Sequence, residues 1–170
     1  MKSLIIETSS EKACLILAQG SKPIAARVLP GGAELSKKLP MEVKRLLDCH
    51  SFKPDFIAAG TGPGSYTGVR VGAALAKSLA LGWQIPLLGF CSLKGFVPPI
   101  EGSFVILVDA RMGGFYALFG TKENDRLSFE TPLLISPADA RLQRISHFAS
   151  PHPELILKRA PIAAFSFETA

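Results

Sequence analysis

The sequence predicts an α/β fold made of two related lobes. Short apolar segments typical of strands alternate with two longer segments typical of helices. Residues 104–120 also repeat the pattern of residues 3–17, which is an apolar strand, a carboxylate, a short polar turn and a second apolar strand. The repeat favours a first lobe over residues 1–98 and a second over residues 99–170. Two unrelated hairpins in a small protein would also match this loosely by chance.

Length and composition limit the number of domains and the broad class of protein. A chain of 170 residues fits one domain or two small lobes. Apolar residues make up 48% and charged residues 19%, which excludes a disordered chain, and no apolar stretch approaches the roughly 20 residues of a membrane span. The opening residues carry one lysine and end their apolar run at Glu7, so they predict a strand rather than a secretory signal. We expect a soluble protein with no membrane segment.

The cysteines and the net charge limit which kinds of protein this chain can be. Cys14, Cys49 and Cys91 are odd in number and form no C-x-x-C pair, so neither a disulfide framework nor a zinc knuckle is predicted. A cytoplasmic protein fits best. The net charge of +5 would suit an acidic partner such as RNA, but the basic residues are scattered in short pairs. Solvated helix faces are therefore favoured over a nucleic-acid patch.

The first lobe opens with an antiparallel meander and one amphipathic helix. Residues 3–7, 13–18 and 23–29 are apolar runs separated by short polar turns. Residues 34–49 then carry apolar side chains at helical spacing, and these are Leu35, Leu39, Val43, Leu46 and Leu47. Pro40 lies inside this segment, so it either kinks the helix or marks its first turn.

The remaining elements are shorter and less regular. Residues 55–60 predict a strand, residues 69–81 an alanine-rich helix and residues 85–90 another strand. The second lobe begins with the hairpin at residues 104–120. After it we expect a strand at residues 133–135 and a short helix over residues 137–145 capped by Ser136, and no element is assigned to the tail.

The glycine-rich stretch at residues 60–72 allows two interpretations. A strand, then Gly62 and Gly64, then a helix start can build an anion site; Thr67 would cap that helix and Arg70 would add charge. Neither common nucleotide fingerprint is complete, however. The alternative is packing. Gly62 and Gly64 then supply the turn, while residues spaced four apart let a neighbouring element approach closely, and these are Gly68, Gly72 and Ala76. The residues alone favour packing.

The same stretch, G-P-G-S-Y-T-G-V-R-V-G, resembles the signature of the TsaB (YeaZ) family. Residues 5–14 resemble that family's opening hairpin, and residues 109–116 resemble its second hairpin, in the same order and spacing. Together the matches span roughly residues 1–120. The resemblance implies the actin-like ATPase, or ribonuclease-H-like, fold, in which each of two lobes is built on a mixed sheet.

The resemblance also implies a role. In that family TsaB pairs with TsaD, the subunit that transfers the threonylcarbamoyl group to adenosine of tRNA, and the ATPase TsaE joins them. TsaB itself is regarded as a non-catalytic relative within the glycoprotease family. We therefore expect no catalytic residue, metal or cofactor, and contact with tRNA only through the complex. The alternatives are a stand-alone ATP-dependent phosphotransferase of this fold and, less favoured, a glycoprotease-like hydrolase.

The chemistry-bearing residues agree with a non-catalytic subunit. A metal-dependent relative would need H-x-x-x-H on one helix face, and this chain has only His50, His147 and His152, none four apart. Glu7 and Asp109 could hold Mg²⁺ against a nucleotide. The turn after Glu7, however, lacks the glycine that lets a phosphate approach the backbone. We therefore favour the interpretation that both carboxylates are remnants that hydrogen-bond the hairpin turns. Ser65 is not expected to act as a nucleophile, because it has no base nearby in sequence and no G-x-S-x-G turn.

Two departures from the family matter. The family usually continues well past residue 170, which implies a shortened second lobe. The family's first helix commonly opens with a histidine, whereas this chain has Ala33-Glu34-Leu35-Ser36, so no contact of that histidine carries over.

The resemblance places the partner surface on the two first-lobe helices, where paired helices of two subunits meet. We expect the following residues on it: Leu35, Leu39, Met41, Val71, Leu75 and Leu79. Without a TsaD-like subunit, the same surface could pair with itself in a homodimer.

Overall fold

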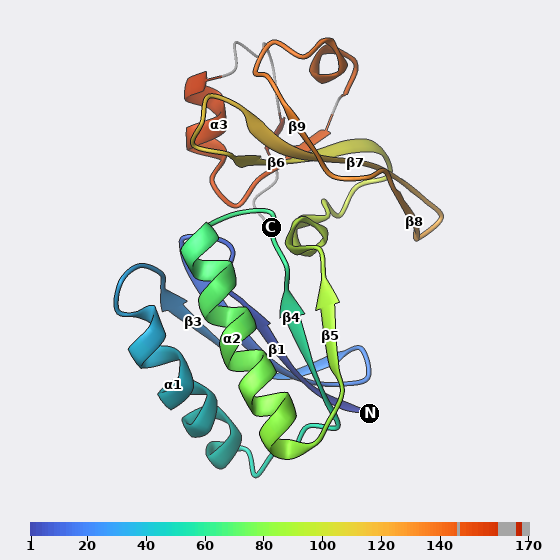
Figure 1. The fold of residues 1–170 in the computed structure, drawn as a ribbon. Coiled ribbons are helices and arrows are strands. Elements are labelled where there is room, and N and C mark those ends of the chain that lie inside the picture. Colours follow the sequence, from blue (N-terminus) through green and yellow to red (C-terminus); the bar gives the residue numbers. More distant parts are fainter. Residues whose placement is uncertain (146, 160–165, 168–170) are drawn as a thin grey trace. The chain divides into compact units, whose positions relative to one another are not determined.

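The computed structural model describes residues 1–145, 147–159 and 166–167 (Figure 1). The chain forms two compact units, Met1–Ser92 and the residues from Leu93 onward. This division lies six residues before the boundary at residue 98 that the sequence suggests. Within the described residues, no helix has both the length and the apolar character needed to cross a membrane.

The first unit contains a five-stranded sheet in the order β3-β2-β1-β4-β5. Strands β1 (Lys2–Glu7), β2 (Lys12–Gln19) and β3 (Lys22–Pro30) form the expected antiparallel meander. Strands β4 (Phe56–Gly60) and β5 (Leu87–Phe90) then add in parallel to β1. The carboxyl ends of β1, β4 and β5 therefore lie at one edge of the sheet.

Two helices cover one face of this sheet, α1 (Leu35–Cys49) and α2 (Tyr66–Trp83) (Figure 1). Alternate residues of β1 and β2 point toward them, as a period of two requires, and meet the apolar stripe of α1. Pro40 lies within α1 and does not mark its start. The buried residues of this core include Leu4, Ile6, Leu15, Leu17, Leu35, Leu39, Val43, Leu46 and Ile57.

The second unit contains a six-stranded sheet, with order β11-β10-β6-β7-β8 and β9 paired to β7. Its strands are β6 (Gly102–Asp109), β7 (Phe115–Glu123), β8 (Arg126–Phe129), β9 (Leu133–Ile135), β10 (His147–Ala149) and β11 (Ser166–Phe167). A helix α3 (Pro153–Arg159) and two short 3₁₀ helices, η1 (Ser92–Phe96) and η2 (Ala140–Arg144), complete the described elements. Its own core includes Val105, Leu107, Phe115, Ala117, Phe119 and Phe148.

The two sheets repeat one arrangement. Strand β1 pairs antiparallel with β2 and parallel with β4, and β6 pairs antiparallel with β7 and parallel with β10. Each first strand ends at a carboxylate, Glu7 or Asp109. The structure thus confirms the repeated hairpin seen in the sequence.

Two helix predictions need correction. Helix α2 begins at Tyr66, three residues before the predicted start, and extends to Trp83. The predicted helix at residues 137–145 is only the 3₁₀ helix η2, and its N-cap is Asp139, whose side chain accepts a hydrogen bond from the Arg141 amide. Ser136 instead accepts a hydrogen bond from the Ala138 amide at 3.2 Å, which closes the turn before η2.

Candidate partner surface and the glycine-rich turn

The glycine-rich turn follows β4 and leads into α2. Its backbone groups bond to the neighbouring strand end, because the Thr61 amide donates to the Phe90 carbonyl at 2.8 Å. The Gly62 amide donates to Ser92 Oγ at 2.9 Å, and the Ser92 amide donates back to the Gly62 carbonyl at the same distance. These amides are therefore already satisfied within the protein.

The start of α2 is also capped internally. Ser65 Oγ accepts a hydrogen bond from the Gly68 amide at 3.2 Å, which makes Ser65 the N-cap. The Ser65 amide donates to the Ser9 carbonyl at 2.6 Å. The prediction that Thr67 caps this helix is wrong, because the helix begins earlier and Thr67 lies exposed in its first turn.

Three glycines of this segment allow the turn after β1 to pack against it. A Cβ atom on Gly64 would collide with the Ser9 carbonyl, and one on Gly68 would collide with the Thr8 carbonyl. A Cβ on Gly72 would collide with the Thr8 hydroxyl, whose own hydrogen bond goes to the Gly68 carbonyl at 2.8 Å. Gly62 has φ +81, in the region that favours glycine. These contacts agree with the packing interpretation, and the neighbour is the Thr8–Ser9 turn.

Arg70 lies outside this turn. Its guanidinium stacks over the Tyr66 ring, 5.3 Å from the ring centre, and its Nη1 lies 3.4 Å from the Tyr66 hydroxyl. Both side chains are exposed. Arg70 therefore contacts the first turn of its own helix.

Glu7 and Asp109 make the same local hydrogen bond in their two units. Glu7 Oε1 accepts from the Ser9 amide at 2.6 Å, and Asp109 Oδ1 accepts from the Arg111 amide at 2.8 Å. Each carboxylate thus holds the turn of its own hairpin, as expected for the remnant interpretation. Glu7 Oε2 is buried and has no hydrogen-bond partner among the described residues.

Cys14 lies opposite Glu7 in the register of β1 and β2. Burial raises the pKa of the Cys14 thiol, and the negative charge of Glu7 raises that pKa further. The thiol therefore stays protonated at neutral pH, which lowers its nucleophilicity.

The described residues contain no group of three histidine, cysteine or acidic side chains that could hold a metal ion. His50 follows the end of α1 and is exposed. His147 lies in β10 and His152 lies just before α3.

The outer side of α1 and α2 differs from the surface expected from sequence. Leu35 and Leu39 are only 3% and 0% exposed, because they pack into the core of their own unit. The partner surface proposed below therefore excludes both residues. Val71, Leu75 and Leu79 are half-buried against the same core. Met41 is 64% exposed, as expected, and sequence reasoning missed Leu81, which is 81% exposed.

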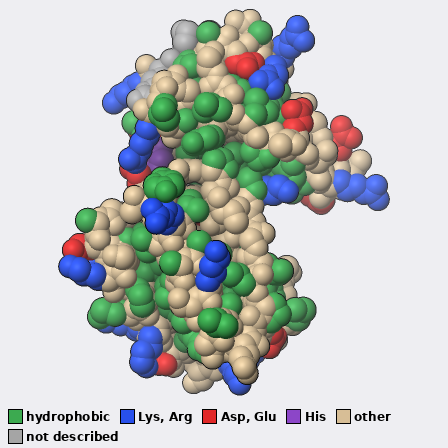
Figure 2. Space-filling model, in the orientation of Figure 1, with side chains coloured by type: hydrophobic (Ala, Val, Ile, Leu, Met, Phe, Trp, Pro, Cys, Tyr) green, Lys and Arg blue, Asp and Glu red, His purple; other side chains and the backbone are tan. Residues whose placement is uncertain are grey.

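Basic side chains surround these apolar residues. Helix α1 carries four basic and two acidic residues, and α2 carries two basic residues and no acidic one. Lys44 pairs with Asp48 and Arg45 pairs with Glu42, but Lys38 and Lys77 have no ion pair within the described part of the chain. Figure 2 shows apolar and basic side chains mixed over this face of the first unit.

The repeated unit, an antiparallel hairpin extended by a parallel strand, defines a protein of the actin-like ATPase, or ribonuclease-H-like, fold. A structure of YeaZ from Pseudomonas aeruginosa has this architecture, with a TM-score of 0.79, 20% identity, and coverage of 99% of this chain and 84% of that one. The family model of TsaD, tRNA N6-adenosine threonylcarbamoyltransferase, matches residues 31–166.

Among curated relatives, the tRNA threonylcarbamoyladenosine biosynthesis protein TsaB of Escherichia coli is 32% identical over 123 residues, covering 68% of this chain and 53% of that protein. TsaB of Bacillus subtilis is 34% identical over 122 residues, with the same two coverages. This chain therefore belongs to the TsaB (YeaZ) family, within the wider family that the TsaD model describes. It spans about half the length of these curated relatives.

Proposed function

We propose that this chain is a partner subunit in the biosynthesis of threonylcarbamoyladenosine on tRNA, and that it binds and activates a TsaD-like transferase. The relatives named tRNA threonylcarbamoyladenosine biosynthesis protein TsaB support a role in this pathway. The observation that carries the partner role is the exposure of Met41 and Leu81 on the two helices that cover the first sheet. These two side chains leave apolar area exposed on both helices, which supports a contact with another protein there.

The chain supplies no catalytic centre in this proposal. The glycine-rich turn, which the sequence offered as a possible anion site, packs against the protein's own Thr8–Ser9 turn. The Gly62, Ser65 and Gly68 amides donate to protein oxygens rather than standing free for an anion. The chain would thus act by binding the transferase.

The same role implies further partners and a location in the cell. We propose that a TsaE-like ATPase joins the pair, that tRNA is reached only through the complex, and that the complex is cytoplasmic. The basic excess on α1 and α2 suits an acidic surface on the transferase. In the absence of the transferase, the same surface would form a two-fold homodimer.

A reconstitution experiment tests this proposal. The TsaD-like subunit is expressed with and without the tagged chain, and modified adenosine in tRNA is measured by mass spectrometry. We expect the two proteins to co-purify and the modification to depend on the chain. A transferase that neither binds the chain nor needs it for modification would contradict the proposal. Micromolar, magnesium-dependent ATP binding by the chain alone would instead favour the phosphotransferase alternative.

A further inference from the structure

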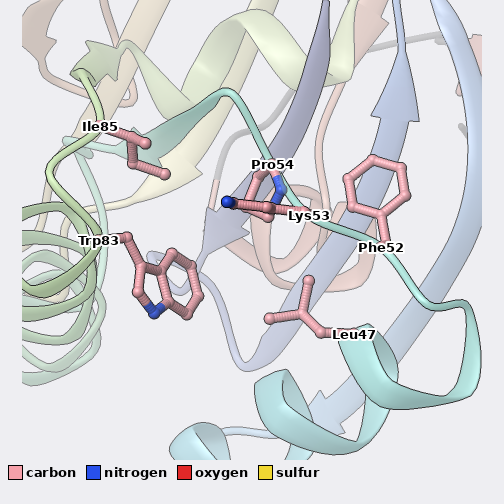
Figure 3. A pocket seen from close by; sticks show the side chains of 6 residues that line it. All are labelled: Leu47, Phe52, Lys53, Pro54, Trp83 and Ile85. Carbon is pink, nitrogen blue, oxygen red and sulfur yellow. The ribbon is translucent and has the colours of Figure 1, made fainter.

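A pocket lies between the ends of α1 and α2, at the opposite edge of the sheet from the glycine-rich turn. Its volume is about 270 Å³, and it is lined by Leu47, Phe52, Lys53, Pro54, Trp83 and Ile85 (Figure 3). Five of these side chains are apolar and one is a lysine. The pocket lies at the ends of the two helices that carry the proposed partner surface, because Leu47 belongs to α1 and Trp83 is the last residue of α2.

Helix α1 ends in a Schellman motif that forms one wall. The Phe52 amide donates to the Leu47 carbonyl at 3.0 Å, and the Ser51 amide donates to the Asp48 carbonyl at 3.2 Å. Ser51 takes the left-handed conformation, with φ 46, that this motif requires. The motif brings Phe52 back beside Leu47, and both side chains face the pocket (Figure 3).

Helix α2 ends in the same motif and forms the facing wall. The Ile85 amide donates to the Ala80 carbonyl at 3.1 Å, and the Gln84 amide donates to the Leu81 carbonyl at 3.3 Å. Gln84 is left-handed with φ 55. Both walls are thus fixed by backbone hydrogen bonds, so the pocket exists before any ligand binds and little ordering is needed on binding.

The size of the pocket selects the kind of occupant. Sites for drug-sized ligands and cofactors usually measure roughly 300–1,000 Å³. A volume of about 270 Å³ lies just below that range. It suits one large apolar side chain of a protein better than a cofactor.

The charge beside the pocket indicates what accompanies that side chain. Lys53 is exposed and has no ion pair among the residues that the structure describes. Two helix C-termini also end here and carry roughly half a negative charge each, but this effect is confined to the last turn and several of the carbonyls are already hydrogen-bonded. The full charge of Lys53, with the basic excess of α1 and α2, favours a carboxylate.

We propose that this pocket is an anchor site that receives a leucine or phenylalanine side chain, flanked by an acidic residue, from the TsaD-like subunit. The inference rests on the proposed function, because it names the contact by which the partner is held. Trp83, partly exposed at the rim, supplies the large rigid contact area that is common at the centre of protein interfaces. Lys53 pairs with the flanking carboxylate.

The only tryptophan of the chain gives a direct test. Incorporation of 5-fluorotryptophan into this chain alone yields one ¹⁹F resonance, from Trp83. Titration with the unlabelled TsaD-like subunit should shift that resonance in a saturable manner. Lys53→Glu should weaken the affinity by about tenfold at low salt, and the loss should shrink as salt is raised. The matched control Lys22→Glu, an exposed lysine on β3, should change the affinity by no more than about twofold.

Three results would overturn the anchor site. Tight binding with an unmoved Trp83 resonance and no effect of Lys53→Glu would place the contact elsewhere and leave the proposed function intact. A resonance that shifts with the concentration of the chain itself, but not with the TsaD-like subunit, would assign the pocket to a second copy. No binding by the wild-type chain would overturn both the anchor site and the proposed function. Circular dichroism of each variant checks that the fold is retained.

Discussion

The Thr8 hydroxyl donates a buried hydrogen bond of 2.8 Å to the carbonyl of Gly68, a residue 60 positions later in the chain. This bond joins the hairpin turn after β1 to the first turn of α2. It forms because Gly68 has no side chain, so the Thr8 backbone can approach the helix. The family's glycine-rich segment therefore serves, in this chain, to hold the hairpin against the helix.

Gly68→Ala should destabilise the first unit. The added methyl group would collide with the Thr8 carbonyl, and relieving that overlap should lower the free energy of unfolding by about 1–3 kcal/mol. Urea denaturation followed by circular dichroism measures the change. Gly82→Ala on the same helix is the matched control. Nothing lies within 4 Å of its added Cβ, so it should leave stability unchanged or raise it by about 0.5 kcal/mol.

Gly64→Val should lower the melting temperature for a related reason. Its Cβ would meet the Ser9 carbonyl, which already accepts the Ser65 amide, and the cost should be on the order of 1–3 kcal/mol. Thermal unfolding of the variant alone provides the measurement. If stability is unchanged and only a nucleotide or RNA complex is weakened, Gly64 belongs to a binding site and the packing interpretation is wrong.

Cys14 should react more slowly with iodoacetamide than the exposed Cys49 at neutral pH. Burial and Glu7 both raise the pKa of the Cys14 thiol, so the reactive thiolate is scarce until the pH rises further. Mass spectrometry of tryptic peptides gives both rates across pH 7–10. Glu7→Gln should speed the Cys14 reaction and leave the Cys49 rate unchanged. Equal Cys14 rates in the two proteins would show that Glu7 has no electrostatic effect there.

The isolated chain should neither hydrolyse ATP nor bind it tightly. The Ser65 and Gly68 amides at the start of α2 donate to Ser9 and Ser65 of the protein itself. Isothermal titration calorimetry with ATP and magnesium should give no heat of binding at micromolar concentrations. Micromolar affinity that disappears in Glu7→Ala would restore the phosphotransferase interpretation.

The strongly patterned parts of the fold could be predicted from sequence. The meander and α1 follow from apolar residues at periods of two and near four, and the repeated hairpin follows from the carboxylates that end β1 and β6. The start of α2 was missed because Ser65 and Thr67 are both good caps, and the helix begins at the first of them. Strand β10 was missed because its three residues are too few to show a period.

The candidate site was harder to predict for two reasons. An amphipathic stripe does not reveal whether it covers the protein's own sheet or a partner, and Leu35 and Leu39 cover the sheet. The pocket depends on two helix ends that are far apart in sequence, with left-handed Ser51 and Gln84 in place of the glycine that usually signals such an end. Only the fold brings Phe52 and Trp83 to one pocket.

The binding of a TsaD-like subunit to surface variants tests the central claim most directly. Met41→Glu and Leu81→Glu each place a carboxylate on the exposed side of α1 or α2, and Val28→Glu, at a residue 61% exposed on β3, is the control of matched exposure. Isothermal titration calorimetry should show that the two helix variants lose at least about tenfold in affinity while the control binds as the wild type does. Wild-type affinity in both helix variants, with folding verified by circular dichroism, would contradict the account.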